Sequence, residues 1–107
     1  MVKNVRIVHK ILNNFDPKMA KYAISQVLSY SKTICILCIV ENQFKCHLLM
    51  GRSEDLDINM KEIFDSVINI INGKGGGSPE LVQGGGTNTA KAPNLIERSL
   101  ELLHKII

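Results

Sequence analysis

The residues best suited to bind another molecule lie in one stretch, residues 73–86, which holds seven of the chain's eight glycines. Its order is Gly-Lys-Gly-Gly-Gly-Ser-Pro-Glu-Leu-Val-Gln-Gly-Gly-Gly. Glycine has no side chain to pack and loses more freedom on folding than other residues, so core packing does not account for this stretch. Bare backbone can instead bring N–H groups together around a phosphate or carboxylate. We therefore expect an anion-binding loop rather than ordinary helix or core strand.

A flexible linker is the alternative explanation for so many glycines. Against it, Leu81, Val82 and Gln83 separate the two triglycine runs, and a linker has no use for apolar residues of this kind. We favour an ordered loop, with a very short strand at residues 81–83.

The cysteines could also do chemistry, but their spacing does not favour it. Cys35 and Cys38 have the CxxC spacing of metal and redox sites, yet they lie in the apolar run at residues 33–40. In a strand, residues three apart point to opposite faces, so the two thiols cannot share a ligand. The three cysteines are an odd number. We interpret them as core residues of a chain in a reducing compartment.

A catalytic group of residues is not visible either. The three histidines are scattered over a strand end, a strand and a helix, and no paired carboxylates sit in a glycine-flanked turn. Such constellations are what general acid–base or metal chemistry requires. We expect no catalysis by this chain alone, no cofactor and no metal site.

The net charge of +3 is distributed unevenly along the chain. Residues 1–32 carry +5, residues 33–72 carry −3 and residues 73–107 carry +1. This mild N-terminal excess fits nucleic acid or another anionic partner, but falls short of a strongly basic domain. The longest apolar run, residues 34–40, is too short to span a membrane, and no signal peptide is visible. We predict a cytoplasmic protein with no membrane association.

The elements that must position the glycines follow from the apolar pattern. The chain reads as one domain over residues 1–107, of class α/β (α+β), with a mixed β-sheet covered by helices in the order β-α-β-β-α-(β)-α. The expected elements are a strand at 2–12, a helix capped by Asp16 and begun by Pro17, a central strand at 33–40, a hairpin partner at 44–50, a helix up to Asn72 ended by Gly73, and a last helix begun by Pro93.

Two nucleotide-binding loops are excluded by context. A dinucleotide fingerprint needs GxGxxG between a strand and a helix, whereas Gly73-Lys74-Gly75 leads to Ser78 at the third glycine position and follows a helix. The chain contains no GxxxxGK[ST] pattern.

The glycine stretch does resemble the signature of the DHHA1 domain, in the form found at the C-terminus of alanyl-tRNA synthetases and of the longer alanyl-tRNA editing proteins. That signature is GGxGGG, a basic residue or Ser, Pro-Asp-Met-Ala-Gln, then a small residue and Gly-Gly. The likeness extends upstream to Ser53-Glu54-Asp55-Leu56 and downstream to a closing helix rich in Leu, so it covers nearly the whole chain.

The resemblance implies a domain that binds the outer corner of the tRNA and brings protomers together. Ser78 stands where a basic residue is common, Glu80 replaces Asp, and Leu81-Val82 replace Met-Ala, which implies modest RNA affinity. In a phosphoesterase branch of the superfamily a His follows the second triplet, and Thr87 here argues against that branch.

The leading hypothesis is therefore a tRNA-binding module of an alanyl-tRNA synthetase or editing protein, with alanine tRNA as the partner that the resemblance implies. Backbone N–H groups would meet phosphate or ribose, and shape rather than base identity would be recognised. The alternatives are a homodimerisation module without RNA affinity and a ferredoxin-like domain that senses a small ligand. The predicted RNA-binding residues are Lys74, Gly75, Gly76, Gly77, Ser78, Gln83, Gly84, Gly85, Gly86 and Arg52.

Overall fold

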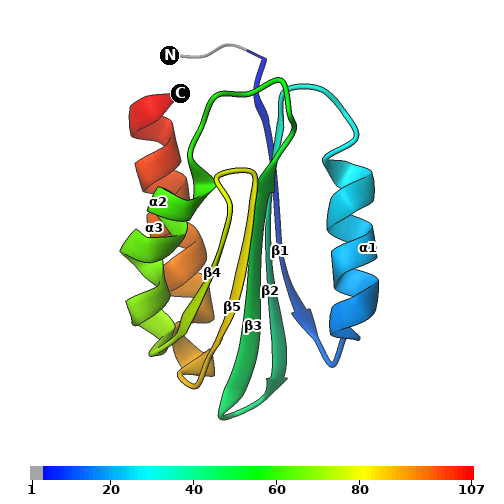
Figure 1. The fold of residues 1–107 in the computed structure, drawn as a ribbon. Coiled ribbons are helices and arrows are strands. Elements are labelled where there is room, and N and C mark those ends of the chain that lie inside the picture. Colours follow the sequence, from blue (N-terminus) through cyan, green and yellow to red (C-terminus); the bar gives the residue numbers. More distant parts are fainter. Residues whose placement is uncertain (1–3) are drawn as a thin grey trace.

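A single β-sheet lies between α1 on one side and α2 with α3 on the other (Figure 1). The computed structural model describes residues 4–107, so Val2 and Lys3 of the predicted first strand lie outside the described residues. The elements in chain order are β1 (Arg6–Asn13), α1 (Pro17–Val27), β2 (Thr33–Asn42), β3 (Lys45–Arg52), α2 (Met60–Val67), η1 (Ile68–Ile71), β4 (Lys74–Gly77), β5 (Leu81–Gly86), η2 (Thr89–Lys91) and α3 (Ala92–Ile106).

The sheet has the strand order β1-β2-β3-β5-β4, with β1 parallel to β2 and the remaining pairs antiparallel. This confirms the predicted mixed sheet covered by helices. The ferredoxin-like alternative is wrong, because there a strand is inserted between the two that a helix connects, whereas β1 and β2 are direct neighbours here. The helices also cover both faces (Figure 1).

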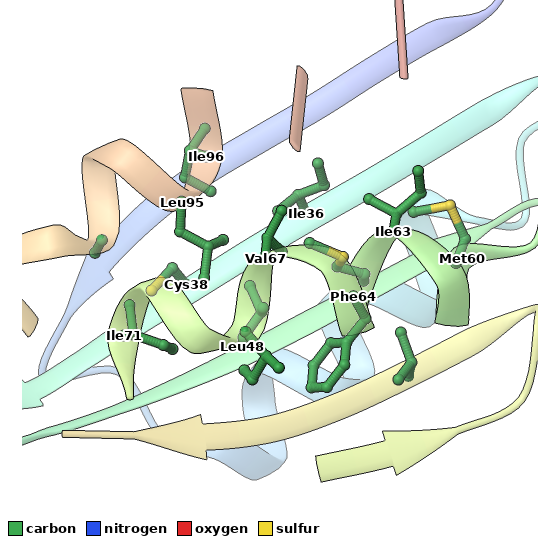
Figure 2. Close-up of a cluster of buried hydrophobic side chains, with 14 of the residues drawn as sticks. Ile36, Cys38, Leu48, Met60, Ile63, Phe64, Val67, Ile71, Leu95 and Ile96 are labelled. Carbon is green, nitrogen blue, oxygen red and sulfur yellow. The ribbon is translucent and has the colours of Figure 1, made fainter. Parts of the chain in front are cut away.

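The sheet separates two hydrophobic cores. The larger core joins the strands to α2 and α3, and Figure 2 shows Phe64 and Val67 of α2 among its side chains. The smaller core packs α1 against the opposite face. Strand β2 is buried on both sides, as its apolar run predicts: Cys38 belongs to the larger core and Cys35 to the smaller one. The two thiols therefore point to opposite faces, as expected.

The helix ends follow local chemistry. Asp16 caps α1, since its Oδ1 accepts a hydrogen bond of 2.9 Å from Lys18 N–H, and Pro17 begins the helix as predicted. The second helix is shorter than predicted, because α2 ends at Val67 and continues as the 3₁₀ turn η1. Asn72, not Gly73, takes the left-handed position after η1, with φ of 52°. Asn tolerates this conformation better than most side chains do.

The largest departure from the sequence prediction concerns the glycines themselves. We expected a loop with one very short strand, and the structure instead contains two paired strands, β4 and β5, that form the edge of the sheet. Glycine strands lack the alternation of side chains from which strands are recognised, so the pattern offered no signal for them.

Candidate functional site

Residues 74–86, which we call the glycine hairpin, consist of β4, β5 and a tight turn. In the turn, Ser78 N–H donates to the Leu81 carbonyl oxygen over 2.9 Å. Ser78 Oγ accepts from the N–H groups of Glu80 and Leu81, both at 3.3 Å. The Pro79 carbonyl oxygen accepts from Met60 N–H at the start of α2, over 2.9 Å. The turn is thus bonded internally and held by the start of α2, which precedes it in the chain.

Some glycines of the hairpin are required because α2 and η1 pack directly on their backbone. A Cβ placed on Gly84 would lie 2.7 Å from Phe64 Cζ and 2.5 Å from the Lys74 carbonyl oxygen. A Cβ on Gly86 would lie 2.5 Å from the Ile71 carbonyl oxygen. Figure 2 shows the Phe64 ring pointing from α2 toward the hairpin strands. At these helix-facing positions only glycine permits the observed packing.

Two other glycines are not required by packing. A Cβ on Gly76 would meet nothing within 4 Å. A Cβ on Gly85 would meet only ordinary contacts, 3.4 Å from the Cys46 carbonyl oxygen and 3.9 Å from His47 Nδ1. The fold therefore tolerates side chains at these two positions, and something else must account for their glycines.

These two glycines lie on the same side of the sheet. Strand register forms two rows across β3, β5 and β4, which are His47–Gly85–Lys74 and Leu49–Gln83–Gly76. Alternation along a strand places both rows on the side opposite Gly84 and Phe64. There α1 packs on β1, β2 and β3, and β5 and β4 are left uncovered (Figure 1). We call this uncovered surface, formed by His47, Lys74, Gly76, Gln83 and Gly85, the open face.

A hollow of about 220 Å³ separates the first turns of α1 from the open face. Pro17 and Lys21 line it from α1, and His47 and Gln83 line it from the sheet. The open face is thus a bare backbone surface bordered by a helix that carries a lysine.

A comparison of sequences places the chain among known proteins. Residues 4–105 match the sequence model of the DHHA1 domain. The chain belongs to the DHHA1 domain family.

Relatives and a solved structure agree with this assignment. The chain is 31% identical over 99 residues to the alanine–tRNA ligase of Buchnera aphidicola subsp. Acyrthosiphon pisum (strain APS), covering 89% of this chain and 11% of that enzyme. It is 27% identical over 108 residues to the alanine–tRNA ligase of Saccharophagus degradans (strain 2-40 / ATCC 43961 / DSM 17024), covering 99% of this chain and 12% of that enzyme. The DHHA1 domain thus spans about one-ninth of the length of these curated relatives.

The fold resembles the crystal structure of the C-Ala domain from Aquifex aeolicus alanyl-tRNA synthetase, with a TM-score of 0.77 at 24% sequence identity. The match covers 97% of this chain and 95% of that chain. At this identity, the similarity shows a shared fold.

The structure brings some of the predicted RNA-binding residues of this DHHA1 domain together and separates others. Lys74, Gly76, Gln83 and Gly85 share the open face. Arg52 lies five residues from His47 along β3, roughly 16 Å away at the rise of a strand. Its Nε donates to the Ile58 carbonyl oxygen over 2.6 Å and its Nη1 to the Ser53 carbonyl oxygen over 3.2 Å. These bonds tie Arg52 to the loop before α2, away from Lys74.

Sequence reasoning missed several residues near the open face. Lys21 of α1 lines the hollow beside it, Lys45 of β3 lies at its border, and His47 of β3 forms part of it. Glu41 lies 3.3 Å from Lys45 Nζ and 4.0 Å from His47 Nε2, so part of this positive charge is balanced. Lys45 and His47 are two residues apart in a strand and so share a face, but nothing in the sequence said that β5 would pair with that strand.

The other candidate chemistry finds no support within residues 4–107. In that range, no three His, Cys, Asp or Glu side chains group as they would around a metal ion. Burial raises the pKa of the Cys35 thiol to about 11 and that of Cys38 to about 12. The same described range contains no helix long and apolar enough to cross a membrane.

Proposed function

We propose that this chain, as a single domain, is a non-catalytic tRNA-binding module of a longer alanyl-tRNA synthetase or alanyl-tRNA editing protein. Membership of the DHHA1 family and the names of its relatives support this role. The chain spans only 11% to 12% of those relatives, so an accessory part of a larger enzyme is the natural assignment. The partner that this assignment implies is alanine tRNA.

The observation that carries the proposal is the pair of glycines on the open face. Gly76 and Gly85 have room for a side chain, yet neither has one. A strand surface without side chains allows a bulky, rigid partner to approach the backbone closely. An RNA backbone is such a partner, because its ribose hydroxyls and phosphates are recognised by shape as well as by charge.

The sheet changes how the glycines would meet RNA. Gly84 and Gly85 lie in β5 between β3 and β4, so their N–H groups point into the sheet rather than toward a ligand. Strand β4 is an edge, and an edge strand directs alternate N–H and C=O groups outward. Ser78 bonds to Leu81 across the turn, so alternation turns the N–H of Gly76 toward β5 and those of Gly75 and Gly77 outward. We therefore assign hydrogen bonding to Gly75 and Gly77, and close contact to the flat surface of Gly76 and Gly85.

Charge would hold the RNA on this surface. Lys74 lies in the row across the open face, and Lys21 stands at the border of the hollow beside it. A lysine that neutralises a phosphate releases a counterion, so affinity falls as salt rises. Because few cations surround the face, we expect modest affinity and a shallow salt dependence.

The test measures binding of an alanine tRNA transcript by gel shift across a salt series. Lys74→Glu should weaken binding about tenfold or more, and Lys74→Ala should reduce the slope of log affinity against log salt by about 1. Gly76→Val should also weaken binding, because it puts bulk on the open face, while urea unfolding shows no loss of stability. Sedimentation of the same samples reports whether the chain forms the predicted homodimer.

Lys105→Glu is the matched control, since it makes the same charge change on α3, on the opposite side of the sheet. It should alter affinity far less than Lys74→Glu. The proposal would be wrong if the Lys74 and Gly76 variants bound tRNA as tightly as the Lys105→Glu control. It would also be wrong if the unaltered chain did not bind tRNA.

A further inference from the structure

An exposed aromatic ring stands at the end of the sheet where β3 begins. Phe44 is 73% exposed, more than any other large hydrophobic side chain of the described residues. Cys46 and Leu48, which follow it along β3, are by contrast fully buried. Phe44 itself lies outside the strand, because β3 begins only at Lys45. Its ring is therefore free to contact a partner.

The loop that carries Phe44 is held in place. Phe44 N–H donates to Asn42 Oδ1 over 2.8 Å within the hairpin turn. The Gln43 carbonyl oxygen accepts a hydrogen bond of 2.8 Å from Thr89 Oγ1 of η2. A side chain on a loop fixed at both sides loses less entropy when it binds than one on a free loop.

Phe44 borders a hollow of about 370 Å³ at the start of the glycine hairpin. The volume lies within the range of about 300–1,000 Å³ that is typical of small-ligand sites. Lys45 of β3 and Lys74 of β4 line it from two different strands, and bare backbone at Gly85 and Gly86 lines it between them. Both lysine side chains are exposed. The hollow thus combines an aromatic ring, an open glycine surface and two cations.

We propose that this hollow holds an unstacked nucleobase of the RNA, with Phe44 as its stacking surface and Lys45 and Lys74 on the adjoining phosphates. The proposal rests on the proposed function and specifies what the domain would recognise. Aromatic side chains stack on bases that are splayed out of a helix, and lysines beside them balance the backbone charge. A regular RNA duplex offers no free base plane, so the preferred ligand is a loop or bulge.

The charge around Phe44 favours this occupant over an apolar protein partner. A hydrophobic docking site is usually depleted of lysine at its centre, whereas Lys45 and Lys74 both line this hollow. The site also continues directly into the open face through Lys74 and Gly85. A single RNA chain can therefore follow both surfaces.

The experiment uses tryptophan as a reporter, since the chain contains none. Phe44→Trp is expected to bind the alanine tRNA transcript at least as well as the unaltered chain, and stacking should quench its fluorescence. Tyr30→Trp is the matched control, because Tyr30 is also exposed, at 65%, but lies far from the hollow. It comes just before the start of β2, whereas Phe44 comes just after the end of that strand. Its fluorescence should change little when tRNA is added.

Affinity provides the second measurement. Phe44→Ala should weaken tRNA binding about tenfold or more. It should leave the salt slope unchanged, because removing a ring releases no counterion. The unaltered chain and Phe44→Ala should bind a blunt-ended RNA duplex with the same affinity. Tyr30→Ala should bind tRNA like the unaltered chain.

The outcomes separate this inference from the proposed function. If Phe44→Ala binds tRNA normally while Lys74→Glu does not, the stacking site is wrong and the open face survives. If Phe44→Ala changes only the sedimentation of the chain, the hollow belongs to a protein interface, and the inference is again wrong. If the unaltered chain does not bind tRNA, both proposals fail.

Discussion

The two sides of the glycine hairpin use the same residue for opposite reasons. On the helix side, Gly84 and Gly86 are glycine because Phe64 and Ile71 occupy the space that a Cβ would need. On the open face, Gly76 and Gly85 have that space and leave it empty. Adjacent positions of β5 therefore differ in how much stability the fold would lose if a methyl group were added. A glycine-rich sequence can combine a packing requirement and a binding surface, and only the neighbours tell the two apart.

The largest expected effect is on the helix side. Gly84→Ala forces Phe64 and the Lys74 backbone to move, and such overpacking typically costs about 1–3 kcal/mol. The free energy of unfolding, measured by urea denaturation, should fall by that amount. An unchanged unfolding midpoint would show that α2 does not pack closely on β5, and the distinction between the two sides would be lost.

The buried thiols provide a second, intermediate measurement. At pH 8 iodoacetamide should modify the native chain very slowly, because burial raises the pKa of Cys35 to about 11 and that of Cys38 to about 12. Burial also raises the pKa of Cys46, whose Sγ donates to the Gly86 carbonyl oxygen over 3.6 Å. Because these pKa values are raised in the fold, the thiols become reactive where unfolding restores ordinary values near 8.5.

The same labelling can locate the effect of Gly84→Ala. Cys38 and Cys46 lie in the core beside α2, whereas Cys35 lies in the core beside α1. A local opening of the hairpin should accelerate modification of Cys38 and Cys46 about tenfold or more, with Cys35 still protected. Mass spectrometry of the labelled peptides distinguishes the sites. Equal acceleration at all three thiols would mean that the two cores open together.

The smallest expected effect is on the open face. Gly76→Ala should stabilise the chain slightly, by about 0.4–1 kcal/mol, because alanine restricts the unfolded state and the folded state has room for it. Among the described glycines only Gly77 has a positive φ, so the backbone at Gly76 suits alanine. A loss of stability as large as that of Gly84→Ala would contradict the assignment of Gly76 to an open surface.

The local features of this chain were predictable from nearby residues. Asp16 and Pro17 mark the start of α1, since a carboxylate cap and a fixed φ act within one helical turn. The apolar run after Lys32 predicts the buried β2. Because successive side chains of a strand point to opposite faces, Cys35 and Cys38 are separated. The family resemblance of the glycine stretch was also visible in the sequence, and the DHHA1 match confirms it.

The features that define the candidate site depend on which segments pair. Lys74 and Arg52 were predicted to act together, yet strand register places Lys74 beside Gly85 while Arg52 bonds to the loop before α2. Phe44 is exposed beside the start of the hairpin, and nothing in its own segment indicated that Lys74 and Gly85 would border the same hollow.

The amino-acid sequence by itself determined the start of α1, the buried strand and the family of this protein, because these depend on short-range chemistry and composition. The tertiary structure decided which glycines are packed, which are open, and which cations accompany them. The physical reason is that glycine has no side chain whose size or polarity would indicate, from the sequence, whether the position is packed or exposed. Its role is set by the atoms that lie opposite it, and these come from α2, η1 and the neighbouring strands.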